Sequence, residues 1–593
     1  MTWTRSLAIA FLFCAANTAH AAYKVQIDAP KPVQSLLKDF LDISRYQDRD
    51  DISDEQLKFM MDTAGDQVRE LTSTEGYFTP VTKVSAQTET EAGAEGKQAV
   101  RRITISVDPG PRTEISSAEV SVTGAAARDD QATVARLRED WSLPVGQPFR
   151  QEDWNRAKNA GLEKLQQKKY AAARIASSEA RVDPDEHQAD LAVRYDSGPA
   201  FTLGPLQITG TRRYPESIIR NVNPLTVGEP YDVNRLLALQ RQIQNTPYFS
   251  NAIVAIDDDL EHPEQTPVKV QVTEFPTQRV RAGVGYSTDT GAQVEGRYSH
   301  YNVFNKAYVF DSQLRLEQKR QYGVLSLAMP PDDKAFVNSI NTSYDRTKLE
   351  GIDLRSQQVG FKRARNSENY DTTYSLTYYR DELSQEDGST LPANTIVTPG
   401  KHRALVPGFA WSRRNVDDPI FPRKGNLLTL EAGFALKGLL TDQSFSRLYG
   451  RFKQFVPVGK RDIVVLRAEL GGVFTAGSAG AVPPSLLFRT GGNDSVRGYS
   501  YQSIGNEQNG TVYPTKYLAV GSSEYQRWFS ENWGAAVFYD VGAAADNWNN
   551  KTFYHGVGTG ARWRSPVGTL NLDLAYGIQK RQIRPHISLG IAF

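Results

Sequence analysis

From about residue 278 onward, apolar and polar side chains alternate with a period of two in one segment after another. Within 569–577, Leu572 and Leu574 share one face, whereas Asp573 and Ala575 share the other. Because successive side chains of a strand point to opposite faces, this pattern predicts β-strands with one apolar and one polar face. We count about 16 such segments, and an even number of strands of this length is typical of a transmembrane barrel.

The alternation predicts an all-β barrel with an apolar outer face and a polar, wet lumen. In this phase Phe538 and Asp540 point into the lumen, whereas the segment that holds Glu524 has no clean period and leaves the direction of that side chain open. The expected strands are 279–287, 293–302, 308–318, 321–329, 337–344, 357–365, 372–380, 403–412, 426–434, 445–456, 463–474, 517–529, 533–543, 556–564, 569–577 and 585–593.

The first half of the chain has a different pattern, in which helical periodicity alternates with short strands and repeats about every 80–90 residues. The segment VDPGP at 107–111 recurs as YDSGP at 195–199, and VGQPF at 145–149 recurs as VGEPY at 227–231. Each repeat reads strand, helix, helix, strand, strand, which predicts a small α+β domain. The first repeat is the least regular. The pattern predicts helices in it at 32–42 and 54–71.

The domain organisation expected from these patterns has five parts. A leader at 1–21 is followed by three α+β domains at 22–110, 111–198 and 199–276, and then by the barrel at 277–593.

The leader has the features of a secretory signal peptide. It has a basic start, an apolar run at 7–16 and the small-residue cleavage site Ala19-His20-Ala21, and it is too short to span a bilayer as a helix. The mature chain is expected to begin at Ala22. Cys14, the only cysteine, lies inside the leader, so we expect no disulfide or thiol chemistry in the mature protein.

Composition excludes several classes of function. The 69 Lys and Arg residues nearly balance the 68 Asp and Glu residues, which argues against a general nucleic-acid binder. The sequence contains no Gly-x-Ser-x-Gly nucleophile elbow, no His-Glu-x-x-His zinc motif and no Walker loop. We therefore expect no catalytic residues, no metal site and no cofactor.

A long Gly-rich connection at 475–515 carries the most specific chemistry. A connection of this length is usually either functional or disordered. It contains Val496-Arg497-Gly498-Tyr499, and an arginine folded inward needs carboxylates, because an unpaired buried charge is very costly. The following strands offer Glu524 and Asp540. The alternative is a disordered surface loop with a solvated arginine.

Val-Arg-Gly-Tyr at 496–499, followed by Phe-x-Asp-x-Gly at 538–542, resembles the inward-folded loop and strand partner of POTRA-barrel outer membrane proteins. That superfamily includes BamA, TamA and the two-partner secretion exporters. The resemblance implies that Arg497 anchors the loop in the lumen by pairing with Asp540, with help from Glu524. The α+β repeats look like three POTRA domains, which serve either as rigid spacers or as sheet edges that pair with peptide strands.

The final strand, 585–593, resembles the terminal β-signal by which outer membrane barrels are recognised. It alternates up to the aromatic Phe593, with Gly590 on the opposite face from Leu589. In a closed barrel it pairs with the first strand, 279–287, and this seam is a candidate site of lateral opening.

Glycine and proline weaken strand pairing, so the composition of the two seam strands favours opening there. The first strand contains Gly283 and Gly285, and the last contains Pro585 and Gly590. A client strand could then pair with the exposed edge. The alternative is that these glycines only relieve crowding in a filled lumen. Cysteines near Val284 and Leu589 are expected to face each other across the seam.

Three POTRA-like repeats, a barrel and no amino-terminal helical plug most resemble the TamA family. The resemblance implies an outer-membrane subunit of a translocation and assembly module, located in a Gram-negative bacterium with its POTRA domains in the periplasm. Its expected partners are a TamB-like inner-membrane-anchored protein, client proteins such as autotransporters, and outer membrane lipids. The alternatives are a two-partner-secretion-type polypeptide exporter, a BamA-like general assembly factor and a passive porin.

Overall fold

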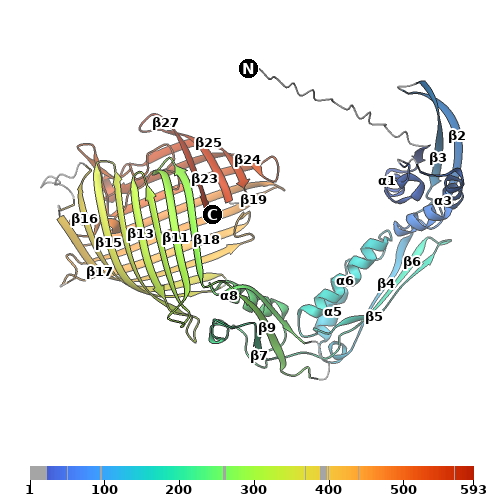
Figure 1. Ribbon diagram of the computed structural model, residues 1–593, viewed down its shortest axis with the longest axis horizontal. Helices are drawn as coiled ribbons and strands as arrows, with labels where there is room; N and C mark the ends of the chain where they lie inside the picture. Colours follow the sequence, from blue (N-terminus) through green and yellow to red (C-terminus); the bar gives the residue numbers. More distant parts are fainter. Residues whose placement is uncertain are drawn as a thin grey trace, which may run out of the picture. The chain divides into compact units, whose positions relative to one another are not determined.

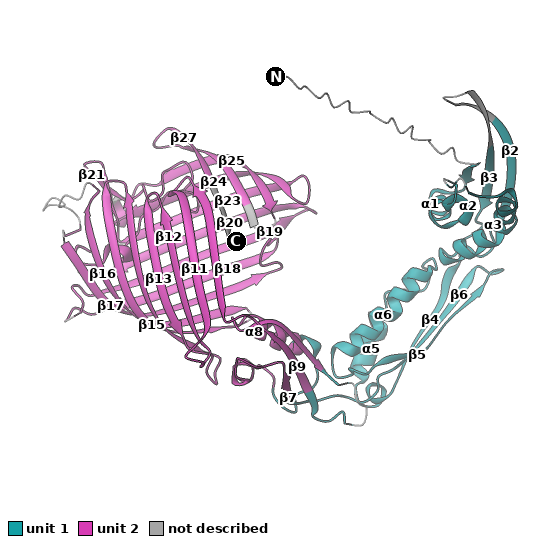
Figure 2. Ribbon diagram, viewed as in Figure 1, with its two compact units in different colours: residues 1–205, 226–234, 256–267 teal, residues 206–225, 235–255, 268–593 magenta. Residues whose placement is uncertain are grey.

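A computed structural model describes residues 23–47, 49, 51–93, 96–257, 262–367, 369–386, 397–398, 400–438, 440–565 and 568–592. The expected signal peptide and Phe593 lie outside these residues. The chain forms two compact units, drawn in teal and magenta in Figure 2, which comprise residues 1–205, 226–234 and 256–267, and residues 206–225, 235–255 and 268–593. In the described part of the chain, no helix combines the length and apolar character needed to cross a membrane.

The first α+β repeat is a three-stranded sheet of order β1-β3-β2 with helices packed against it. Ser53 and Gln56 form a capping box that starts α3, and α3 buries Leu57, Ala64 and Val68 at helical spacing. The helix predicted at 32–42 is interrupted at Leu41, whose backbone is extended. The elements are β1 (Tyr23–Asp28), α1 (Lys31–Phe40), α2 (Asp42–Arg45), α3 (Asp54–Thr74), β2 (Val81–Gly93) and β3 (Gly96–Asp108).

The second repeat has the same construction, with sheet order β4-β6-β5. Strand β6 alternates strictly between buried and exposed residues, and its buried Leu191, Val193 and Tyr195 share one hydrophobic core with Trp154 and Leu165 of α6. The elements are β4 (Glu114–Thr123), α4 (Ala125–Asp129), α5 (Gln131–Glu139), α6 (Gln151–Gln167), β5 (Arg174–Asp183) and β6 (Gln188–Asp196).

The third repeat, with sheet order β7-β9-β8, leads directly into the barrel. The hydroxyl of Tyr248 donates to the Ala307 carbonyl at 2.8 Å, and Asn221 Nδ2 donates to the Pro331 carbonyl at 2.8 Å. Both acceptors lie in turns between barrel strands, so these bonds hold the repeat against the barrel. The elements are β7 (Leu203–Thr209), α7 (Ser217–Asn221), α8 (Val233–Gln244), β8 (Phe249–Ile256) and β9 (Thr266–Glu274).

Sixteen antiparallel strands close the carboxy-terminal barrel, from β10 in green to β27 in red in Figure 1. Each strand overlaps a segment predicted from alternation, which confirms the predicted fold class. The strands are β10 (Gln278–Ser287), β11 (Gly291–Val303), β12 (Tyr308–Glu317), β13 (Arg320–Ala328), β14 (Val337–Leu349), β15 (Ile352–Asn366), β16 (Tyr370–Gln385), β17 (Gly400–Val416), β18 (Gly425–Ala435), β19 (Phe445–Val458), β20 (Asp462–Phe474), β23 (Tyr517–Trp528), β24 (Trp533–Ala545), β25 (Tyr554–Ser565), β26 (Gly568–Gly577) and β27 (Gln582–Ala592).

Strands β14 and β15 extend beyond their predicted ends because ion pairs continue the ladder where the apolar period stops. Arg320 pairs with Asp345 at 2.5 Å, and Arg346 pairs with Asp353 at 2.6 Å, in each case across two neighbouring strands. Opposite charges on adjacent strands stabilise a sheet without apolar burial. A search for hydrophobic alternation alone therefore places these ends too early.

The predicted phase of the late strands is confirmed. Leu572 and Leu574 are exposed on the outer face of β26, whereas Asp573 and Ala575 between them are buried inside the barrel. Asp540 is fully buried on β24, and its neighbour Tyr539 is exposed. The polar faces of these two late strands therefore point into the barrel, as expected for a wall that faces lipid on the outside.

Candidate functional site

The connection between β20 and β23, residues 475–516, folds into the barrel, and we call it the inward loop. It contains a 3₁₀ turn at Pro484–Leu486 and a small hairpin of β21 (Asn506–Gln508) and β22 (Thr511–Tyr513). Its Val496, Tyr499 and neighbouring apolar residues share a hydrophobic cluster with wall residues such as Val520. The lumen is therefore not uniformly polar and wet, because the loop carries apolar side chains that fill part of it.

Arg497, only 6% exposed, lies at the centre of the buried contacts that the loop makes with the wall. Its Nε donates to Asp540 Oδ2 at 2.7 Å and its Nη2 donates to Asp540 Oδ1 at 3.0 Å, which is a bidentate pair. Its Nη1 donates to Glu524 at 2.7 Å and to Asp573 at 3.0 Å. The guanidinium carbon also lies 3.3 Å from the ring centroid of Phe538. The structure thus brings together Arg497, Asp540 and Glu524. The alternative prediction, a surface loop with a solvated arginine, is wrong.

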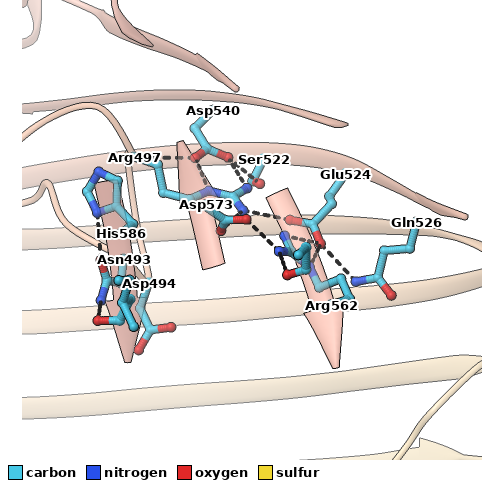
Figure 3. A network of polar contacts seen from close by, with 12 residues as sticks. Asn493, Asp494, Arg497, Ser522, Glu524, Gln526, Asp540, Arg562, Asp573 and His586 are labelled. Atoms are coloured by element: carbon cyan, nitrogen blue, oxygen red, sulfur yellow. Dashed lines mark hydrogen bonds and ion pairs between the residues drawn. The ribbon is translucent and has the colours of Figure 1, made fainter. Parts of the chain in front are cut away.

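A second buried arginine completes the cluster (Figure 3). Arg562 on β25 donates to Glu524 at 3.0 Å and to Asp573 at 2.5 Å. The Ser522 hydroxyl donates to Asp540 at 2.6 Å. The arginines alternate with carboxylates, so each buried charge has a partner of opposite sign, which offsets the cost of removing the charges from water. We call Arg497, Ser522, Glu524, Asp540, Arg562 and Asp573 the arginine cluster.

Sequence reasoning did not join Arg562, Asp573 and Ser522 to the cluster. The alternation placed Asp573 on the polar face of its strand, and that was the available signal. Alternation reports the face of a residue but not its height in the barrel, and the height decides which polar side chains meet. Glu524, whose direction was open, points into the lumen.

Glycines let the loop backbone approach the wall. Gly498 has φ +92°, and a Cβ there would lie 2.7 Å from the Gly577 nitrogen. A Cβ at Gly556 would lie 2.0 Å from the Arg497 carbonyl oxygen, and one at Gly542 would lie 2.6 Å from Val496. The last glycine of the 538–542 motif is thus explained by contact with the loop.

Tyr499 fixes the loop beyond Gly498. The Tyr499 ring is buried and packs edge-on against Tyr554 at 5.4 Å between centroids. The Tyr499 hydroxyl has two acceptors within reach of its one hydrogen, the His555 carbonyl at 3.0 Å and Gln579 Oε1 at 2.5 Å. All four residues of the 496–499 motif therefore contact the wall of late strands.

The seam between β10 and β27 is paired over a short stretch. Residues 283–287 pair with 588–592, whereas β10 pairs with β11 over its whole length. In this register Gly285 lies opposite Gly590 and Tyr286 lies opposite Leu589. Val284 lies opposite Ile591, so the expectation that Val284 and Leu589 face each other is wrong by two residues along β27. Phe593 lies outside the described residues, so its role stays a prediction.

The chemistry of the site is that of a fixed charge network. The arginine cluster borders a cavity of about 320 Å³, which is also lined by Lys453, Arg467 and Asp494. Among the described residues, no group of three His, Cys, Asp or Glu side chains is arranged to hold a metal ion. The arrangement can hold a loop in a defined position.

Two family models match the chain. Residues 278–593 match the model described as the Omp85 superfamily domain, and residues 201–274 match the POTRA model described as surface antigen variable number repeat. The two matches adjoin each other, and together they cover the third repeat and the whole barrel.

Curated relatives carry the name outer membrane protein assembly factor BamA. The protein of Nitratidesulfovibrio vulgaris is 24% identical over 424 residues, which cover 69% of this chain and 52% of the relative. The protein of Neisseria meningitidis serogroup B is 20% identical over 487 residues, which cover 70% of this chain and 59% of the relative. The chain therefore spans only between half and three fifths of the length of these relatives.

The crystal structure of BamA from Haemophilus ducreyi lacking POTRA domains 1–3 shares the fold. The TM-score is 0.59 at 16% sequence identity, and the match covers 81% of this chain and all of that chain.

Proposed function

Because this chain belongs to the Omp85 superfamily, we propose that it inserts or translocates client proteins at the outer membrane. Its barrel lies in that membrane, and its POTRA domain lies in the periplasm. We infer that the first two repeats are POTRA domains as well, since their sheets have the same strand order as the third, with three helices in place of two. The role is TamA-like, with a TamB-like inner-membrane-anchored partner, autotransporter-type clients and contact with outer membrane lipids.

The observation that carries this proposal is the short ladder at the seam. In the described part of the chain the seam has five registered pairs, 283–287 with 588–592, whereas β14 and β15 have thirteen. Separating those five pairs would expose an edge of β10. Such an edge presents backbone N–H and C=O groups that a client strand can satisfy.

Because the inward loop fills part of the lumen, we favour the seam over the lumen as the route by which a client protein enters the membrane. Buried residues of the inward loop, including Leu487, Phe488 and Ile504, pack against the wall on one side of the barrel. A polypeptide that crossed through the lumen would have to displace this cluster and the arginine cluster together. The polypeptide exporter and the passive porin are therefore less favoured than assembly at the wall.

A BamA-like general assembly role is the second candidate, because the curated relatives bear that name. The two roles differ in client range. Depletion of a general factor would lower the amounts of most outer membrane barrels, whereas depletion of a TamA-like subunit would affect a narrow set. Quantitative proteomics of outer membranes after depletion separates them.

A disulfide lock across the seam tests the mechanism. Cysteines at Tyr286 and Leu589 face each other in the backbone register, and Cys14 in the expected leader is the only native cysteine. Oxidation is expected to abolish client insertion, and reduction is expected to restore it. The control pair, Leu327→Cys with Ile340→Cys, joins β13 to β14 at directly opposed positions and should have no effect. Full insertion by the oxidised seam pair would contradict the proposal.

The partner is tested separately. Phe59 on α3 is 67% exposed, and a photocrosslinking amino acid there lies on an accessible face of the first repeat. Capture of an inner-membrane-anchored protein, identified by mass spectrometry, would support the TamB-like partner. Capture of outer-membrane lipoproteins alone would favour the BamA-like role instead.

A further inference from the structure

One residue of the inward loop contacts both edges of the barrel seam. Asn493 Nδ2 donates to the Ile587 carbonyl of β27 at 3.2 Å. Its Oδ1 accepts the Thr288 hydroxyl at 3.2 Å, and its backbone N–H donates to Asp289 Oδ2 at 3.1 Å. Thr288 and Asp289 form the turn that follows β10. Asn493 therefore lies between the turn after the first strand and the backbone of the last strand.

His586 sets the orientation of the Asn493 amide. His586 is 4% exposed, and its Nε2 accepts the Gly498 N–H at 2.8 Å, so this nitrogen carries a lone pair. The hydrogen of the neutral ring then lies on Nδ1, which donates to Asn493 Oδ1 at 2.6 Å. The opposite amide orientation would place the NH₂ group against this donor and the oxygen against the Ile587 carbonyl. The contacts thus agree on one tautomer and one amide orientation, and Figure 3 shows His586 beside Asn493.

These contacts lie where the seam ladder ends. Beyond the last registered pair, Ser287 with Ser588, the connection between the two strands continues through Thr288. The Thr288 N–H donates to the Ile587 carbonyl at 3.0 Å, and the Ile587 N–H donates to the Thr288 hydroxyl at 3.1 Å. Asn493 bonds both Thr288 and Ile587, so it reinforces the outer end of a short ladder.

The loop holds Asn493 in a fixed position relative to Arg497. The Gly491 N–H donates to Ser495 Oγ at 2.9 Å, and the Gly492 N–H donates to the Val496 carbonyl at 3.2 Å. Arg497 is bound in turn to β23, β24 and β26 by the arginine cluster. When the seam separates, the loop therefore stays with the late strands, and Asn493 releases Thr288 and Asp289.

We propose that Asn493 and His586 are positioning residues which, with Thr288 and Asp289, form a seam latch that holds the first hairpin against the last strand. The barrel opens laterally only when the bonds from Asn493 to Thr288 and Asp289 break. This deepens the proposed function and rests on its seam. Through the latch, the position of the inward loop sets the fraction of barrels that are open.

The latch is tested in the full-length protein in lipid bilayers without clients. Spin labels at Leu316→Cys on β12 and Ile583→Cys on β27, two exposed positions outside the latch, report the distance across the seam by double electron–electron resonance. Asn493→Ala and Thr288→Val each remove neutral hydrogen bonds, so we expect each to raise the open-to-closed ratio about tenfold. The effect of the double variant should fall short of the product of the two single effects, because both remove the bond between Asn493 and Thr288, while each also removes a separate bond to Ile587.

Two matched variants control for a general loss of order. Thr288→Ser keeps the hydroxyl and should keep the wild-type distances. Asn506 lies elsewhere in the inward loop, and its side chain donates to Asp546 after β24. Asn506→Ala removes this bond and should not open the seam. Heat-modifiable gel mobility checks that each barrel is folded. If Asn493→Ala does not fold, unchanged distances in Thr288→Val still overturn the latch, since that variant removes the hydroxyl bond to Asn493 from outside the loop.

Unchanged distances in folded Asn493→Ala and Thr288→Val would overturn the latch. That result is distinct from failure of the proposed function, which the disulfide lock reports through client insertion. Insertion lost in the locked barrel together with unchanged spin-label distances rejects the latch and keeps the function. Wider distances together with full insertion in the locked barrel keep the latch and reject the function.

Discussion

The inward loop contacts the barrel at two places of very different chemistry. At the arginine cluster, Arg497 makes charge-assisted bonds to Asp540, Glu524 and Asp573 in a buried site. At the seam latch, Asn493 makes neutral bonds to Thr288 and Ile587, beside a backbone ladder that covers only 283–287. Hydrogen bonds to charged groups contribute about 1.5–3 kcal/mol each and neutral ones about 0.5–1.5 kcal/mol.

This difference indicates which contact of the inward loop breaks when the barrel opens. Opening the arginine cluster would leave several charges buried and unpaired, so it resists small displacements and opens only as a whole. Opening the latch exposes amide and hydroxyl groups and the Asp289 carboxyl, all of which water can satisfy at little cost. The loop is therefore bound firmly to the late strands, whereas its contact with the first hairpin can be released.

The largest effect is expected from breaking the arginine cluster. Among the residues that the structure describes, Arg497→Ala leaves the Asp540 carboxylate with Ser522 and a backbone N–H as donors. We expect a loss of about 3–5 kcal/mol in the free energy of unfolding. Denaturant titration of the barrel in lipid vesicles measures it. Arg497→Lys keeps the charge but loses the bidentate geometry. Its free energy of unfolding should therefore lie between those of the wild type and Arg497→Ala.

A double-mutant cycle with Asp540→Ala sharpens this result. The two residues act as one unit, so the loss in the double variant should be much smaller than the sum of the single losses. Additive losses would show that the pair contributes little coupling energy.

An intermediate effect is expected from glycines in the barrel wall. Some of these glycines lie against the inward loop, and others face open space. Gly556→Ala places a Cβ 2.0 Å from the Arg497 carbonyl oxygen, and the crowding should cost about 1–3 kcal/mol. Gly296→Ala on β11, two strands from the seam, meets nothing within 4 Å. It should leave stability unchanged or raise it slightly, since alanine loses less chain entropy than glycine. Equal losses from the two substitutions would contradict the proposed close packing of the loop.

The smallest effect is a pH dependence of the seam latch. Burial raises the pKa of the Asp289 carboxyl to about 6, while the Asn493 N–H lowers it, nearby Asp494 raises it and Lys319 lowers it. A carboxyl whose pKa is higher in the closed state binds a proton there first, so closing is favoured below pH 6 and this advantage is lost as pH rises through 6. From pH 7.5 to 5.5 we expect the closed-to-open ratio to rise about fourfold.

Asp289→Asn isolates this contribution. Protonation of His586 at Nε2 would remove the acceptor for the Gly498 N–H and act in the opposite direction, and Tyr501 also faces Asp289. Those effects remain in the variant, so the spin-label difference between wild type and Asp289→Asn gives the Asp289 effect alone. An identical pH profile in both proteins would exclude it.

Local patterns in the sequence determined the elements of this protein. A period of two placed the barrel strands, recurrence of short segments marked the repeats, and helical spacing located α3. The 496–499 motif singled out Arg497, and the phase of its strand gave the direction of Asp540. These properties depend on neighbours along the chain, so they can be read without the fold.

The tertiary structure alone decided which of these elements meet. Arg562 and Asp573 join Arg497 because the stagger of the strands brings them to the same height, and that stagger follows from barrel closure. The register at the seam, with Val284 opposite Ile591, arises in the same way. Asn493 meets Thr288 only because a long loop folds back across the lumen. Alternation specifies the face of each side chain, whereas distances across the barrel depend on how all sixteen strands pair at once.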